Sequence, residues 1–265
     1  MLKFLKIIFL FFITKFGYNI RKQEIIDKSN DPIWVVSKIL DVEKVSVVVD
    51  AGASIGDITL KFTEDFPNSE VHAFEPFPLF FETLNEKSKT YKRIIPYACA
   101  LSNTNGKALF NINKSEDTNS LLNTEFHKSN PHSSLLETKG TIEVETKTLD
   151  KIFPKETIDL LKLDLQGGEY NALKGAENLL KHGRIKCIIC EVMFQKSYKN
   201  QSNGSELILY LEEQGFKIFN FYQNHYHHGE LLQSDIIFYH KSISNDVDRL
   251  KKENFLPFSN YLATK

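Results

Sequence analysis

An acid and two glycines at the end of the apolar run that begins at Val47 have the types and spacing to bind a small charged ligand. The run ends at Asp50 and continues as D-x-G-x-x-x-G, with Gly52, Ala53 and Gly56 in the turn. Glycines let the chain turn tightly into the amphipathic stretch 58–66, and they leave room for a ligand against bare peptide. An acid at the strand end can face an ammonium group. The alternative interpretation is an ordinary strand-turn-helix connection.

The spacing also discriminates between ligands. A dinucleotide fingerprint, G-x-G-x-x-G, would need glycines where the chain has Asp50, Gly52 and Ile55, so nicotinamide binding is disfavoured. S-adenosylmethionine, which has no pyrophosphate to cradle, fits better. The next expected strand, 70–75, ends in Glu75, 19 positions after Gly56, and Pro76 stops it. An acid there accepts hydrogen bonds from two ribose hydroxyls in doubly wound folds, although a surface glutamate at a strand end is also common.

Composition and charge narrow the class of protein. A chain of 265 residues can form one large α/β domain, and a net charge of -1 offers no field that would attract nucleic acid. Cys187 and Cys190 form C-x-x-C within an apolar strand, where positions three apart face opposite sides of the sheet. With Cys99 as the third cysteine, no zinc set is complete, and we predict no metal site. Buried thiols indicate a reducing compartment, the cytoplasm.

The N-terminus carries an apolar segment, residues 2–16. Its uninterrupted core, 7–13, is 7 residues long, well below the ~20 that a spanning helix needs. A helix that packs on the protein or a second copy, a helix on a membrane surface, and a processed signal all remain open, and peripheral membrane contact is one expectation. We expect residues 1–44 to be an extension, 45–241 the domain and 242–265 a tail.

Alternating apolar and amphipathic segments predict a mostly parallel sheet with helices on both faces, closed by an antiparallel hairpin. Ser102 and Asn103 should lie at the tip of the third strand. Residues 106–113 and 141–148 resemble strand pieces that flank a polar loop or lid, 115–140. The expected strands are 45–50, 70–75, 93–101, 158–164 and 185–191, the helices are 58–66, 78–89, 169–182 and 205–214, and the hairpin joins 216–222 to 234–240.

A second group of acids follows the fourth and fifth strands. Asp164 ends a central strand at the edge where such sheets bind ligands, although a structural turn acid is possible. Glu191 ends the next strand and should lie near it, so that one of the two carboxylates can accept a hydroxyl proton. Glu169 lies in the first turn of the following helix, where it could either stabilise the helix N-terminus or have a functional role, and the sequence favours neither. The cluster His225-Tyr226-His227-His228 should lie in the hairpin loop, where its three histidines could supply a metal ligand or a base, but we expect a solvated polar loop.

Six motifs follow one another along the chain: D-x-G-A-x-x-G at 50–56, F-E-P at 74–76, A-L-S at 100–102, T-L-D at 148–150, L-L-K-L-D-L-Q-G-G-E at 160–169 and G-A at 175–176. In this order they resemble the motifs of the FkbM family of S-adenosylmethionine-dependent methyltransferases. The resemblance runs from about residue 47 to 238 and implies a Rossmann-like seven-stranded class I methyltransferase fold that methylates a hydroxyl of a sugar or polyketide. It also implies cofactor contacts at Ser102 and Asn103. Asn103 stands where relatives often have an acid, and Gln166 replaces the more usual glutamate.

We therefore predict an S-adenosylmethionine-dependent O-methyltransferase that acts on a glycan or small-molecule hydroxyl. Three alternatives remain: a nicotinamide-dependent oxidoreductase, a metal-dependent O-methyltransferase with Asp164 and Glu191 as ligands, and a non-catalytic scaffold that docks through residues 2–16.

Overall fold

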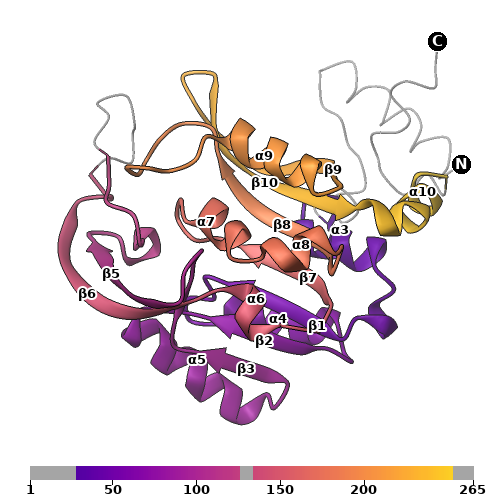
Figure 1. Cartoon of the computed structure of the whole chain (residues 1–265), viewed down its shortest axis with the longest axis horizontal. Helices are drawn as coiled ribbons and strands as arrows, with labels where there is room; N and C mark the ends of the chain where they lie inside the picture. Colours follow the sequence, from indigo (N-terminus) through magenta and orange to yellow (C-terminus); the bar gives the residue numbers. More distant parts are fainter. Residues whose placement is uncertain (1–27, 126–133, 253–265) are drawn as a thin grey trace, which may run out of the picture.

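A seven-stranded sheet runs through the part of the chain that the computed structural model describes, residues 28–125 and 134–252 (Figure 1). The strand order is β3-β2-β1-β7-β8-β10-β9. The pairs from β3 to β8 are parallel, whereas β10 runs antiparallel to both β8 and β9. The predicted fold class is confirmed. The strands are β1 (Val47–Ala51), β2 (Glu70–Phe74), β3 (Ile94–Tyr97), β7 (Ile158–Leu163), β8 (Ile185–Met193), β9 (Phe216–His227) and β10 (Glu230–His240).

Two apolar clusters bury the two faces of this sheet, because parallel strands covered by helices on both sides are apolar on both. One face is covered by α6 (Leu149–Ile152), α7 (Glu169–Lys174), α8 (Glu177–Lys181) and α9 (Gly204–Glu213). The other face is covered by α3 (Pro32–Ile39), α4 (Asp57–Asp65) and α10 (Ser244–Lys252). Cys190 belongs to the first cluster and Cys187 to the second, which confirms that they face opposite sides.

Helix α5 (Pro78–Thr90) packs beside β3 through Leu84, next to Ala53 and Ile94. Helices α3 and α10 lie outside the expected 45–241 domain, yet both contribute to a cluster that contains strand residues. Short 3-10 helices occur at η1 (Val42–Lys44), η2 (Glu116–Thr118) and η3 (Lys241–Ile243).

The third strand is shorter than predicted. It ends at Tyr97, which pairs with Phe74, the last residue of β2. Because Pro76 follows and β2 stops, nothing remains for β3 to pair with beyond this point. Residues 100–101 instead form β4 (Ala100–Leu101) in a second sheet of order β4-β6-β5. This sheet contains β5 (Gly106–Asn113), as predicted, and β6 (Thr138–Lys147), and its two long strands curve together beside the main sheet (Figure 1).

Two other predicted elements differ. The helix expected over 169–182 is broken into α7 and α8 at Gly175, whose position leaves no room for a side chain: a Cβ would lie 2.0 Å from the Ser102 carbonyl oxygen. The hairpin is longer than expected, since His228 and Gly229 both have positive φ and form a two-residue turn that lets pairing continue to His227 and Glu230. The prediction that His225 and His227 lie in a loop is therefore wrong.

Within the described ranges, no helix is long and apolar enough to cross a membrane. The predictions about residues 2–16 concern a segment outside those ranges.

Candidate functional site

A cavity of about 320 Å³ opens where the order of the parallel strands reverses, between the loops that follow β1 and β7. Doubly wound sheets bind their ligands at this position. Residues after β2, the β3–β4 connection, β5 and the η2 segment complete its walls. The lining residues are Gly52, Ser54, Phe74, Glu75, Pro76, Phe80, Cys99, Ala100, Leu101, Phe110, Glu116, Asp117, Asn119, Leu121, Asp164, Leu165, Gln166 and Gly168.

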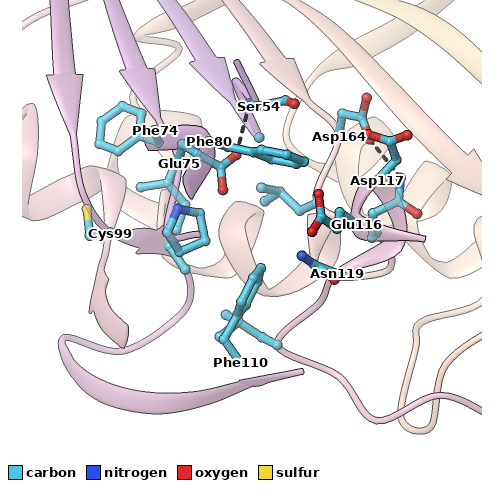
Figure 2. A pocket seen from close by; sticks show the side chains of 18 residues that line it. Ser54, Phe74, Glu75, Phe80, Cys99, Phe110, Glu116, Asp117, Asn119 and Asp164 are labelled. Atoms are coloured by element: carbon cyan, nitrogen blue, oxygen red, sulfur yellow. Dashed lines mark hydrogen bonds between the residues drawn. The ribbon is translucent and has the colours of Figure 1, made fainter. Parts of the chain in front are cut away.

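The cavity changes from apolar to acidic along its length. Figure 2 shows Phe74 and Cys99 at one side, Asp117 and Asp164 at the other, and Glu75 between them. A ligand that matches this gradient has an apolar ring at one end, hydroxyls in the middle and a cationic group at the other end.

Glu75 is buried with both carboxylate oxygens held by main-chain donors. The Ser54 N–H donates to Oε2 at 2.9 Å, and the Phe77 N–H donates to Oε1 at 2.8 Å. Ser54 reaches this position with a φ of 49°, in a loop whose Gly52 and Ala53 N–H groups bond to the Phe74 carbonyl. Burial raises the pKa of Glu75 to about 7, although these two hydrogen bonds act to lower it. Each oxygen keeps lone-pair capacity for a ligand hydroxyl.

Gly52 allows the loops after β1 and β7 to touch. Its φ is 80°, and a Cβ there would lie 1.9 Å from the carbonyl oxygen of Asp164. Gly56, with a φ of 86°, instead faces Leu84 of α5, where a Cβ would be 2.8 Å from Leu84 Cδ1. The two glycines of the motif therefore serve close packing at different places, and only Gly52 lines the cavity.

Of the predicted cofactor-binding residues, Gly52 and Glu75 line the cavity, and Asp50, Ala53, Gly56, Ser102 and Asn103 do not. The last two follow β4 rather than β3, so their neighbours Cys99, Ala100 and Leu101 form the wall in their place.

Asp50 is fully buried and is paired inside the protein. Its Oδ2 accepts a hydrogen bond from the Thr59 hydroxyl at 2.7 Å, and its Oδ1 lies 3.8 Å from the ammonium of Lys162. Burial raises the pKa of Asp50. The same ammonium lies 3.2 Å from Asp164 Oδ2. Burial lowers the pKa of Lys162, but the charges of Asp164 and Asp50 outweigh it and hold the pKa above its usual value. Lys162 thus links Asp50 to the cavity wall.

The two predicted catalytic acids are brought together by an amide. Gln166 Nε2 donates to Asp164 Oδ1 at 3.0 Å and to Glu191 Oε2 at 3.2 Å. Burial raises the pKa of Asp164, but the Lys162 charge and the hydrogen bonds from Gln166 and Lys162 outweigh it, so the pKa lies below its usual value. Burial and the neighbouring Asp164 charge raise the pKa of Glu191 well above normal. Asp164 lines the cavity as the ionised member, and Glu191 lies behind Gln166.

Glu169 points back into its own turn. Its Oε1 accepts hydrogen bonds from the N–H groups of Leu165 at 2.6 Å and Gly167 at 3.3 Å, and the side chain does not line the cavity. Burial raises the pKa of Glu169 to about 7. These contacts fix the turn after β7, which favours the structural interpretation.

Sequence reasoning did not find Lys162 or the acidic residues of η2. A lysine inside the apolar run of β7 was the available signal, because a buried ammonium needs anionic partners. Glu116 and Asp117 gave no comparable signal, since they reach the cavity only through the pairing of β5 with β6. Among the described residues, no group of three or more His, Cys, Asp or Glu could hold a metal ion.

The sheet order and the cavity at its switch point define a Rossmann-like protein with a site for a nucleoside-containing ligand. Residues 50–218 match the profile described as methyltransferase FkbM domain, and the chain belongs to this family. The predicted family is confirmed, and so is its cofactor, S-adenosylmethionine.

Curated relatives are methyltransferases. Methyltransferase 1 of Beauveria bassiana is 25% identical over 147 residues, 50% of this chain and 59% of the relative. The 2-O-methyltransferase NoeI of Sinorhizobium fredii is 26% identical over 163 residues, 58% of this chain and 66% of the relative. This chain thus spans less than two thirds of either relative. A putative methyltransferase from Streptococcus mutans, solved in complex with SAH, is 12% identical with a TM-score of 0.43, over 79% of this chain and 97% of that one.

Proposed function

We propose that this protein transfers the methyl group of S-adenosylmethionine to a hydroxyl oxygen of a glycan or small molecule. The observation that carries the proposal is the order of groups along the cavity: an apolar end, then Glu75, then Asp164. Adenine, ribose and the amino acid with its sulfonium occur in the same order along the cofactor. NoeI is named a 2-O-methyltransferase, which supports oxygen as the acceptor atom.

The residues present fit this cofactor. The apolar wall of Phe74, Cys99, Leu101 and Phe110 suits the adenine ring, and Glu75 has acceptor capacity for the two ribose hydroxyls. The opposite end would meet the carboxylate of Asp164. Asp50 contributes through Lys162, which it holds beside Asp164.

When bound, the cofactor supplies an electrophilic methyl group on a sulfonium. The protein's part is to hold the acceptor oxygen in line and to exclude water, since positioning supplies most of the rate in such displacements. Asp164, held ionised by Lys162, accepts the hydrogen bond of the acceptor hydroxyl. On methyl transfer from the bound cofactor, Asp164 would take up the proton that the acceptor hydroxyl loses. Gln166, which donates to both Asp164 and Glu191, fixes the orientation of the Asp164 carboxylate.

Titration calorimetry with S-adenosylmethionine tests the cofactor assignment. Glu75→Ala should weaken binding by about tenfold or more, because ribose hydroxyls lose a charged acceptor. Glu82→Ala removes an exposed glutamate of α5 and should bind like the unaltered protein. Unchanged affinity in Glu75→Ala would contradict the assignment.

Incubation of the protein with a labelled methyl donor and fractions of host glycans, lipids and metabolites tests the acceptor class. Label in a base-stable ether of a glycan or small metabolite is the expected product. We further propose a cytoplasmic location, because Cys99, Cys187 and Cys190 are buried free thiols.

A further inference from the structure

A second cavity of about 280 Å³ adjoins the first. The two share two lining residues, Asp117 and Gln166, so they meet at the acidic end of the first cavity, beside Asp164. Residues from η2, the segment before β6, the end of β8 and the hairpin β9–β10 form its walls. The lining residues are Asp117, Thr118, Leu135, Leu136, Gln166, Met193, Gln195, Ser197, Tyr198, His225, Leu232 and Gln233.

The wall chemistry of this cavity selects against charge. The described residues that line it include no lysine and no arginine, and its one carboxylate is Asp117. An anionic ligand would therefore lose its hydration with no permanently charged cation to replace it, since His225 is the one basic side chain among the described lining residues. Besides Asp117, the polar part of the wall consists of glutamine amides, hydroxyls and the His225 imidazole, and the rest is leucine and methionine. A wholly apolar ligand would cover the side-chain oxygen of Gln233, which no described residue engages, at a cost of about 1–3 kcal/mol.

Gln166 is the rigid partition between the cavities. Its Nε2 bonds to Asp164 and Glu191, its Oε1 accepts from the Tyr198 hydroxyl at 3.1 Å, and its main-chain carbonyl accepts from the Ser120 hydroxyl at 2.8 Å. These four bonds use both of its amide hydrogens, so Gln166 shapes the passage rather than binding a ligand strongly.

Gln233 has a side-chain oxygen that can accept a hydrogen bond from a ligand. Its Nε2 donates to Glu191 Oε1 at 2.8 Å, which orients the amide, and no described residue engages its carbonyl oxygen. That oxygen is an acceptor for a ligand hydroxyl. Gln195, whose Nε2 donates to Glu230 at 2.8 Å at the hairpin, presents a second amide on the same side of the hairpin.

We propose that the second cavity is the acceptor subsite and that it takes one neutral, polyhydroxylated ring, such as a single sugar unit. The proposal rests on the function proposed above. A volume of about 280 Å³ lies at the low end of ligand pockets, which suits one ring rather than an extended chain. The amides hold the ring hydroxyls, the leucines pack on its C–H face, and the reacting hydroxyl passes Asp117 and Gln166 toward Asp164.

Saturation-transfer NMR on the SAH-loaded protein tests the subsite. The probes are methyl glycosides of common neutral hexoses and deoxyhexoses, a methyl glucuronide, a hexose 6-phosphate and cyclohexanol. We expect at least one neutral glycoside to bind at millimolar concentration and the two anionic sugars and cyclohexanol to bind at least tenfold more weakly.

Matched variants locate the binding. Gln233→Leu and Gln195→Leu should each weaken glycoside binding about tenfold, because each removes amide contacts of the size of one neutral hydrogen bond. Gln214→Leu makes the same chemical change at the end of α9, outside both cavities, and should have no effect. SAH affinity, measured by calorimetry in every variant, should stay unchanged and also reports whether each variant is folded.

Different failures have different meanings. If SAH does not bind the unaltered protein, the proposed function fails. If SAH binds but no neutral glycoside does, or if glycosides bind equally to Gln233→Leu, Gln195→Leu and Gln214→Leu, the acceptor subsite is wrong while the cofactor site stands. Preferred binding of cyclohexanol or of the anionic sugars overturns the assignment of ligand class.

Discussion

The pKa of Glu75 offers a quantitative test of the cofactor site. Burial raises this pKa to about 7, so in the free protein about half of the carboxyl groups are ionised at pH 7. Ribose hydroxyls donate to the carboxylate, and they donate far less well to the protonated acid. Because the ligand selects the ionised form, its apparent Kd should rise about tenfold as the pH falls from 8 to 6.

The preference of the ligand for ionised Glu75 also predicts that binding releases protons. A ligand that binds the ionised form lowers the pKa of Glu75, so binding at pH 7 should release about half a proton per site. Calorimetry of SAH binding in buffers of different ionisation enthalpy, at pH 6, 7 and 8, measures both the Kd and the proton count.

Glu75→Gln keeps the shape of the side chain and removes its titration. The amide also places an NH₂ group against the N–H of either Ser54 or Phe77, both of which now donate to Glu75. Binding should weaken by about 1.5–3 kcal/mol at pH 8, the usual worth of hydrogen bonds to a charged group, and the pH dependence should vanish. Glu82→Gln, on the exposed face of α5, should keep the slope of the unaltered protein. A Kd that does not change with pH in the unaltered protein, or an equal slope in Glu75→Gln, would exclude Glu75 as the group whose ionisation controls ligand binding.

Three further changes test the frame around the site. Gly52→Ala places a methyl group 1.9 Å from the Asp164 carbonyl oxygen at a positive φ, so it should lower the free energy of unfolding in urea by about 2–5 kcal/mol. Gly140→Ala, with no atom within 4 Å, should change this free energy by no more than about 0.5 kcal/mol. Equal stabilities of the two variants would show that the loops after β1 and β7 can separate freely. Lys162→Met leaves the carboxylates of Asp50 and Asp164 without a cation, so the variant should lose about 3–5 kcal/mol of unfolding free energy at pH 8. The loss should be smaller at pH 5, where the acids can protonate. A loss that does not depend on pH would contradict this prediction. Asp164→Asn should lower kcat about 100-fold or more at saturating S-adenosylmethionine, and it should also weaken SAH binding because the cationic end of the ligand loses a charged partner; an unchanged kcat would exclude Asp164 as the proton acceptor.

The parts of the molecule that the sequence predicted are those whose signals are local. Apolar runs bounded by glycine or proline gave the parallel strands, and Glu75, the carboxylate at the end of such a run, lines the cavity. Ser102 and Asn103 were assigned to the tip of β3, because nothing near them in sequence indicates that Ala100 pairs with Thr146 of β6. A pairing across that many residues depends on where the intervening loop returns, which propensity does not encode.

The cavity residues that the sequence did not predict also depend mainly on contacts between distant segments. Asp117 reaches both cavities because β5 and β6 bring the η2 segment back over the switch point, and Gln233 reaches the second because the hairpin extends beyond the predicted loop. Lys162 differs, since its neighbours Leu161 and Leu163 already mark a buried strand. A lysine there requires acids on adjacent strands, and Asp50 was available as one of them.

Gln166 shows how a departure from the usual residue can be chemically favourable. A glutamate at this position would place a third carboxylate between Asp164 and Glu191, and at least one of the three would have to hold a proton. The amide instead has two hydrogens, one for each neighbouring acid. It therefore stabilises the ionised form of Asp164 without adding charge, while Lys162 does the same from the other side. The acid that faces the cavity is therefore kept ionised by neighbours on both sides, which a glutamate at position 166 would not do.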